Sequence, residues 1–134
     1  MRDENKATLQ ELAKRIDQAD AIVIGGGSGL SSAAGYNYYH WSLALSKALA
    51  PFREQYGFTS PLAGFYYCFS SYGEQWAYYS QYMRFMWEAP TGQPYLDLQA
   101  LVADKPVFVL TTNVDQQFFS GIFQETNLCL SGRL

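Results

Sequence analysis

The sequence is poor in the residues that build disulfide frameworks and metal centres. Its 134 residues include two cysteines, Cys68 and Cys129, which are far apart and show no CxxC spacing, and a single histidine, His40. We therefore expect neither a disulfide framework nor a metal site, and we expect both cysteines to pack as small hydrophobic residues. His40 is either packed among its aromatic neighbours or a general base, because it is the chain's only imidazole.

Strong positive charge and long apolar runs are missing as well. Lys and Arg number 9 against 12 Asp and Glu, for a formal net charge of −3, and the scattered basic residues argue against nucleic acid as a partner. No apolar run approaches the roughly 20 residues that cross a bilayer, and no hydrophobic segment follows the charged N-terminal residues as in a signal peptide. We expect a cytoplasmic protein without a membrane partner.

Two short apolar runs, at 21–24 (AIVI) and 107–110 (VFVL), end abruptly at small and polar residues. Such runs are typical of buried parallel strands that deliver a loop to a ligand. The other predicted elements are helices over 5–18, from Ser31 onward and over 96–101, a loop and helix over 113–123, and a short third strand at 128–130. This order of elements predicts an α/β chain with a parallel sheet.

The middle of the chain, residues 36–95, holds 19 of the 23 aromatic residues. Prolines divide it into short helices and loops, so we predict an inserted helical module. Its longest helix is predicted over 73–88, with one broad aromatic face. The side chains of that face are Trp76, Tyr79, Met83 and Met86, with Tyr82 and Trp87 beside them. These aromatic residues form either the core of the module or a groove for an acyl, lipoyl or peptide group, anchored by Trp76 and Trp87.

The loops that follow the two strands carry the candidate chemistry, because ligands of parallel sheets bind beyond the carboxyl ends of the strands. Glycines in the first loop let a ligand approach the backbone, or they serve only to make the turn. Polar groups in the second loop can hydrogen-bond a ribose or a carboxamide, or they cap the next helix. Neither the usual dinucleotide fingerprint nor a Walker lysine is present. The candidate cofactor-binding residues are Gly25, Gly26, Gly27, Ser28, Gly29 and Ser31 in the first loop and Thr111, Thr112, Asn113, Val114 and Asp115 in the second.

Taken as a pair, the loops resemble the sirtuin motifs G-A-G-I-S-x-x-S-G and T-Q-N-I-D. The matching residues are 27–35 (GSGLSSAAG) and 111–115 (TTNVD), in the same order and each after a strand. The sequence is most similar to bacterial macrodomain-linked sirtuins, which have T-T-N-x-D-x-x-F, matched here through Phe118, and an aromatic segment like residues 74–80 (EQWAYYS). The resemblance covers residues 19–123.

The resemblance implies the N-terminal part of a Rossmann-like NAD-binding domain with about three strands. This domain would consist of residues 1–35 and 96–134, interrupted by the helical module at 36–95. The glycine loop would hold the NAD pyrophosphate. Asn113 would contact the nicotinamide-side ribose and Asp115 the nicotinamide carboxamide, which makes both residues catalytic candidates.

NAD would then be a consumed substrate, whose ADP-ribose passes to an acyl-lysine in deacylation or to a protein nucleophile in ADP-ribosyl transfer. Deacylating sirtuins carry P-D-F-R and a His-Gly pair where this sequence has residues 37–40 (NYYH) and Ser131-Gly132. A serine does not accept a proton near neutral pH, so transfer to protein is favoured over deacylation. An acyl- or lipoyl-bearing protein is a candidate substrate.

The resemblance extends to the N-terminal half of the family domain, and the zinc cysteines and the adenosine-binding part belong to the other half. No zinc is therefore expected in this chain. The alternative is an inactive, truncated half-domain that self-associates through an open sheet edge as a homo-oligomer, or a binding module. Both an enzyme and a non-catalytic protein are compatible with the sequence.

Overall fold

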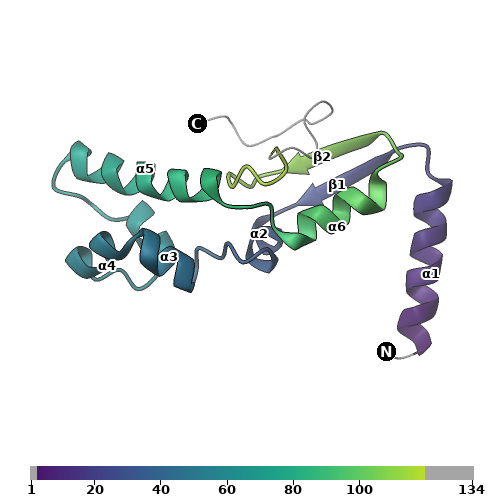
Figure 1. Cartoon of the computed structure of the whole chain (residues 1–134), viewed down its shortest axis with the longest axis horizontal. Helices are drawn as coiled ribbons and strands as arrows, with labels where there is room; N and C mark the ends of the chain where they lie inside the picture. Colours follow the sequence, from purple (N-terminus) through teal and green to yellow (C-terminus); the bar gives the residue numbers. More distant parts are fainter. Residues whose placement is uncertain (1–2, 120–134) are drawn as a thin grey trace.

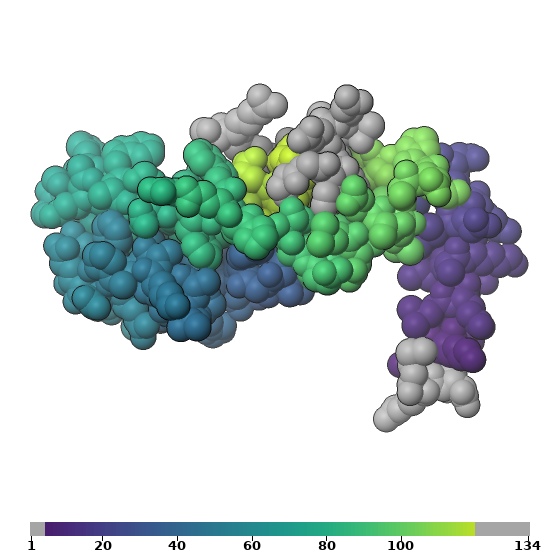
Figure 2. Space-filling view, viewed as in Figure 1, coloured from purple at the N-terminus to yellow at the C-terminus, as the bar shows by residue number. Residues whose placement is uncertain are grey.

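The computed structural model describes residues 3–119, which form an elongated molecule (Figures 1 and 2). Helix α1 projects at one end, the helices of the aromatic region gather at the other, and two strands lie between them (Figure 1). In chain order the elements are α1 (Asp3–Gln18), β1 (Ile22–Gly26), α2 (Ser28–Ala33), α3 (Leu43–Ala48), α4 (Ala50–Tyr56), the 3-10 helix η1 (Pro61–Phe65), α5 (Tyr72–Glu88), α6 (Gln93–Val102) and β2 (Val107–Thr111).

Strands β1 and β2 form a parallel sheet, although the whole helical region separates them in the sequence. Ile22 lies opposite Val107 at one end of the pairing, and Gly26 lies opposite Thr111 at the other. Both predicted strands are thus confirmed, as is a mixed α/β chain with a parallel sheet. The predicted strand at 128–130 lies outside the described residues. Within residues 3–119 the sheet has two strands, so a three-stranded Rossmann-like sheet stays a prediction.

One face of this sheet is packed and the other is more exposed. Alternate residues of a strand point to opposite faces, so each strand contributes one set of side chains to the core. That core consists of Ile24, Tyr95, Val102, Val109 and Phe118. On the opposite face the side chains of Val23 and Phe108 are 64% and 39% exposed. Helix α6 supplies Tyr95 and Val102 and therefore covers the packed face.

The helices next to the sheet differ from the prediction at their starts. Helix α1 confirms the helix predicted over 5–18, but α2 begins at Ser28 rather than Ser31. The reason is that Gly27 adopts the extended N-cap conformation and its carbonyl accepts a hydrogen bond from Leu30 N at 2.9 Å. Helix α6 begins three residues before the predicted 96–101, because Pro94 fits the first turn, where its missing N–H is not needed.

A second core holds the helical region together. Its fully or nearly buried members are Leu45, Leu49, Phe58, Tyr78, Tyr82 and Met86. The ring of Tyr78 contacts Phe52, Phe58 and Phe65 edge-on, with centroid distances of 5.2, 5.5 and 5.6 Å. Three aromatic residues are thus buried in this core, and nine others are partly buried and pack against it. The division into domains at 1–35, 36–95 and 96–134 stays a prediction.

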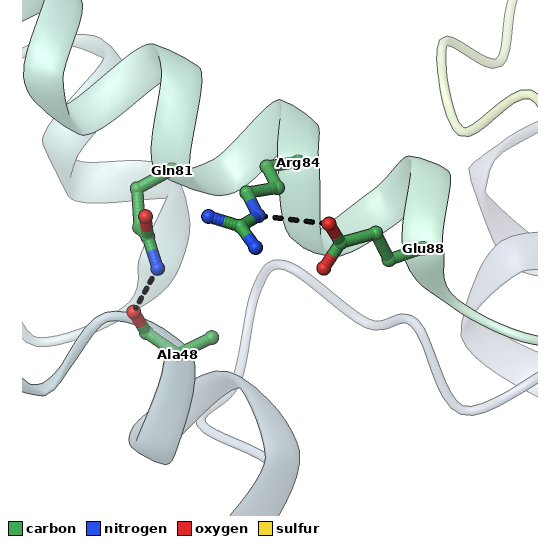
Figure 3. A network of polar contacts seen from close by, with 4 residues as sticks. All are labelled: Ala48, Gln81, Arg84 and Glu88. Carbon is green, nitrogen blue, oxygen red and sulfur yellow. Dashed lines mark hydrogen bonds and ion pairs between the residues drawn. The ribbon is translucent and has the colours of Figure 1, made fainter.

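Helix α5 confirms the helix predicted over 73–88, and its buried face agrees with the predicted aromatic face only at Tyr82 and Met86. The buried stripe is Tyr78, Tyr82 and Met86, whereas Trp76 and Trp87 are 66% and 63% exposed. Two overlapping stripes of large residues fit the helical period, and packing selects the one that faces α3. Figure 3 shows this side of α5, where Gln81 Nε2 donates to the carbonyl oxygen of Ala48 at 3.2 Å. In the same view Arg84 pairs with Glu88 along the helix at 2.8 Å.

Cys68 is exposed, so the prediction that it packs as a hydrophobic residue is wrong, and Cys129 lies outside the described range. The described residues contain no group of three or more His, Cys, Asp or Glu side chains suited to a metal ion. Across residues 3–119, none of the helices combines the length and the hydropathy that a membrane span requires.

Candidate functional site

A cavity of about 400 Å³ lies where the loops after β1 and β2 meet the aromatic helices. One wall is mostly polar: Ser28 and Ser31 come from the start of α2, directly after the first loop, and Thr112, Asn113, Val114 and Asp115 from the loop after β2. The other wall is apolar and aromatic, with Tyr36, Tyr38, Leu62, Phe65, Tyr66, Tyr82 and Met86. Because parallel strands end at the same edge of the sheet, loops far apart in the sequence meet at one site. Six of the predicted site residues are brought together here.

The remaining predicted site residues, four glycines and Thr111, are not among those that line the cavity. At Gly25, Gly27 and Gly29, no atom of the described residues beyond the local backbone lies within 4 Å of where a Cβ would stand. Their backbone is therefore open to approach. Gly26 differs, because a Cβ there would lie 2.7 Å from the ring of Phe118. Packing, rather than ligand approach, accounts for the glycine at this position.

Replacing Gly26 with alanine is expected to destabilise the fold by about 1–3 kcal/mol, the usual cost of overpacking a core. The ring of Phe118 cannot move aside easily, since it is 1% exposed and packs edge-on against Tyr95 at a centroid distance of 4.8 Å. Urea denaturation measures the change. The matched control is Gly25→Ala in the same strand, where a methyl group meets open space and the change should stay within about 0.5 kcal/mol. Equal effects of the two substitutions would contradict this account.

Side chains of the second loop bond it to the first. The buried hydroxyl of Thr111 donates to the carbonyl oxygen of Gly26 at 2.8 Å and accepts from Asn113 N at 3.0 Å. Asn113 Nδ2 in turn donates to the carbonyl oxygen of Gly27 at 2.9 Å. Backbone carbonyls at the end of β1 are thereby satisfied by the second loop, and the polar wall is one connected unit.

Asp115 is the acidic residue of this wall and is only 5% exposed. Its Oδ2 accepts from the hydroxyl of Tyr95 at 3.0 Å, and its Oδ1 accepts from Gln117 N at 3.2 Å. The bond from Gln117 N is the local contact expected if Asp115 only shaped its own loop. The bond from Tyr95, by contrast, connects this loop to α6. Between Asp115 and Gln117, Gln116 has φ 59, a left-handed conformation that non-glycine residues rarely adopt, so surrounding contacts must hold the loop in shape.

Two residues of this network, Tyr95 and Gln117, were missed by the sequence analysis. Tyr95 is fully buried, and Gln117, 1% exposed, accepts a hydrogen bond from Gly92 N through Oε1 at 2.8 Å. A signal for Tyr95 was available, because Tyr95, Leu98 and Val102 recur at helical spacing on one face of α6. No comparable signal marks Gln117, whose partner lies on a distant part of the chain.

The charge of the cavity comes from Asp115, since none of the described lining residues is Lys, Arg or His. Burial, together with the negative charge of Asp115, raises the pKa of Tyr36, and burial raises that of Tyr82 well above its usual value. Both phenols therefore stay neutral at physiological pH. His40, the candidate base, is exposed and is not one of these lining residues. The cavity suits a neutral or cationic group that can donate a hydrogen bond to a carboxylate.

The chain is 33% identical over 127 residues to a protein named Protein ADP-ribosyltransferase from Staphylococcus aureus (strain Mu50 / ATCC 700699). The match covers 94% of this chain and 40% of the relative, so the chain spans about two-fifths of that protein's length. No family model matches the sequence. A match of this extent includes both loops that form the polar wall of the cavity.

Proposed function

We propose that this chain forms the nicotinamide and ribose side of a sirtuin-type NAD site and serves ADP-ribosyl transfer to protein. The observation that carries the proposal is the cavity, where Asn113 and Asp115 meet the serines of the glycine loop opposite an uncharged aromatic wall. The name of the Staphylococcus aureus relative supports the same reaction. The motif resemblance supplies the finer assignment to the sirtuin type.

The chemistry of the wall fits the nicotinamide end of NAD. A carboxamide can donate to the carboxylate of Asp115, and the flat pyridinium ring carries positive charge that an acidic, aromatic cavity accommodates. When the bond between the nicotinamide nitrogen and ribose C1′ breaks, its electron pair leaves with nicotinamide and C1′ becomes electron-poor. Asp115 would stabilise that developing charge, and an acceptor nucleophile would bond to C1′ and lose its proton.

Transfer is favoured over deacylation because no imidazole is among the described residues of the cavity. Deacylating sirtuins use a histidine to activate the ribose hydroxyl, whereas His40 is exposed and outside the described lining. The predicted replacement, Ser131-Gly132, lies outside the described residues. A protein nucleophile does not need the ribose hydroxyl to be activated, so this base is dispensable for transfer.

The proposal is tested by incubating the full chain with NAD and quantifying released nicotinamide by chromatography, alongside NAD binding by calorimetry. A lipoyl- or acyl-bearing protein is then added, and mass spectrometry shows whether ADP-ribose is attached to it or the acyl group is lost. We expect nicotinamide release and ADP-ribose attachment. Loss of the acyl group would identify deacylation instead. A chain that neither binds NAD at millimolar concentration nor releases nicotinamide would refute the proposal.

A further inference from the structure

The residue that connects the polar wall to the core is Tyr95, which does not line the cavity. It is the third residue of α6, and its side chain is fully buried. The ring packs edge-on against Phe118 at 4.8 Å, within the core formed by Ile24 and Val109 of the two strands. Because protein cores are close-packed, this ring has little freedom to move. Its hydroxyl therefore has a fixed position.

The backbone around Tyr95 is held from two sides. Gly92, the N-cap of α6, lies so close to α2 that an added Cβ would stand 2.4 Å from the Cβ of Ala34. The N–H of the same glycine donates to Gln117 Oε1 at 2.8 Å. The start of α6 thus packs closely against the end of α2 and is hydrogen-bonded to the turn that contains Gln117.

The hydroxyl of Tyr95 contacts both catalytic candidates. It donates to Asp115 Oδ2 at 3.0 Å and lies 3.4 Å from Asn113 Nδ2, which donates toward it. A carboxylate only accepts hydrogen bonds and an amide nitrogen only donates them, so the direction of this chain from Asn113 through Tyr95 to Asp115 is fixed. Burial raises the pKa of Tyr95 to about 12, opposed by a hydrogen bond with Ser31 and reinforced by the charge of Asp115. The phenol consequently keeps its proton at neutral pH.

From this geometry we propose that Tyr95 is a positioning residue, whose hydroxyl sets the distance and orientation between the Asn113 amide and the Asp115 carboxylate. The inference rests on the proposed function, because it concerns the residues that would hold the nicotinamide and ribose. Tyr95 would act through them without touching NAD. Removing the Tyr95 hydroxyl should therefore slow the reaction only to the extent that Asp115 and Asn113 move from their positions.

The test is Tyr95→Phe, which keeps the ring and its packing against Phe118 and removes the hydroxyl. We expect kcat/KM for nicotinamide release to fall about tenfold or more, as for other small displacements of reacting groups. Combined with Asp115→Asn, the substitution should add less than about twofold, since interacting residues do not contribute independently. The matched control is Tyr78→Phe, which removes a buried hydroxyl bonded to the carbonyl of Pro61; neither residue lines the cavity. Its kcat/KM should stay within about twofold of the wild-type value.

A second readout does not depend on NAD. In NMR spectra of the full chain, Tyr95→Phe should shift the Asn113 side-chain amide signals and speed hydrogen exchange at Gln117 N, which bonds Asp115. Tyr78→Phe should change neither. Unchanged Asn113 and Gln117 signals in Tyr95→Phe, or independent effects of Tyr95→Phe and Asp115→Asn, would overturn the proposal. A wild-type chain that releases no nicotinamide would refute the proposed function, while the NMR comparison would still decide whether Tyr95 positions the wall.

Discussion

Asp115→Asn is expected to lower the rate of nicotinamide release by about 100-fold or more, with the fold retained. The substitution keeps the shape of the side chain and its bond from Gln117 N, but removes the negative charge that faces the cavity. Removing one preorganised group that stabilises charge in a transition state costs on the order of 100- to 1,000-fold in kcat. Single-turnover measurement of nicotinamide formation separates this loss from a change in NAD affinity.

The control for this experiment is Asp97→Asn on α6. Asp97 is exposed, accepts from Gln93 Nε2 at 2.7 Å and does not line the cavity, so its replacement should leave nicotinamide release unchanged. Circular dichroism should show that both variants are folded. If Asp115→Asn released nicotinamide as fast as the wild type, the assignment of Asp115 to the reacting end of NAD would be wrong.

The largest effect on stability is expected from Tyr78→Ala, at about 3–5 kcal/mol, the range observed for deleting a buried aromatic ring. The ring of Tyr78 occupies the centre of the helical core, and its hydroxyl donates to the buried Pro61 carbonyl. Truncation would leave both a cavity and an unsatisfied acceptor. Since whole domains are stable by only about 5–15 kcal/mol, the midpoint of urea unfolding should fall sharply.

Tyr72→Ala on the same helix is the appropriate comparison. Tyr72 is 83% exposed at the start of α5, so its loss should change the free energy of unfolding by no more than about 0.5 kcal/mol. Comparable losses for Tyr72→Ala and Tyr78→Ala would contradict the central role of the Tyr78 ring in the helical core, because alanine favours the helix at both positions. A small effect at both positions would show that the helical core contributes little.

The strands and the meeting of their loops could be predicted from the sequence because both follow from local patterns. An apolar run that stops at small residues marks a buried strand, and parallel strands share one carboxyl edge. The packed face of α5 could not be predicted in the same way. Tyr79 and Tyr78 fit the helical period equally well, and the choice depends on contacts with Phe52 and Phe58 in other elements.

Within the site, the limit of sequence reasoning is visible at Gly26. A glycine-rich loop predicts backbone open to a ligand, and this agrees with the open space around Gly25 and Gly27. At Gly26, by contrast, the missing side chain leaves room for the ring of Phe118, which lies near the end of the described residues. Residue type alone does not distinguish these two roles, because the neighbour that decides between them is fixed only by folding.

The bonds between the two loops also bear on the thermodynamics of ligand capture. Asn113 and Asp115 are already held by Gly27, Tyr95 and Gln117, so the wall needs little rearrangement to receive a partner. Each carboxylate oxygen still has a second lone pair with which to accept. The conformational entropy of ordering these side chains is therefore lost during folding rather than during association. Such preorganisation makes affinity depend on the rigidity of the protein as much as on the contacts that the ligand itself makes.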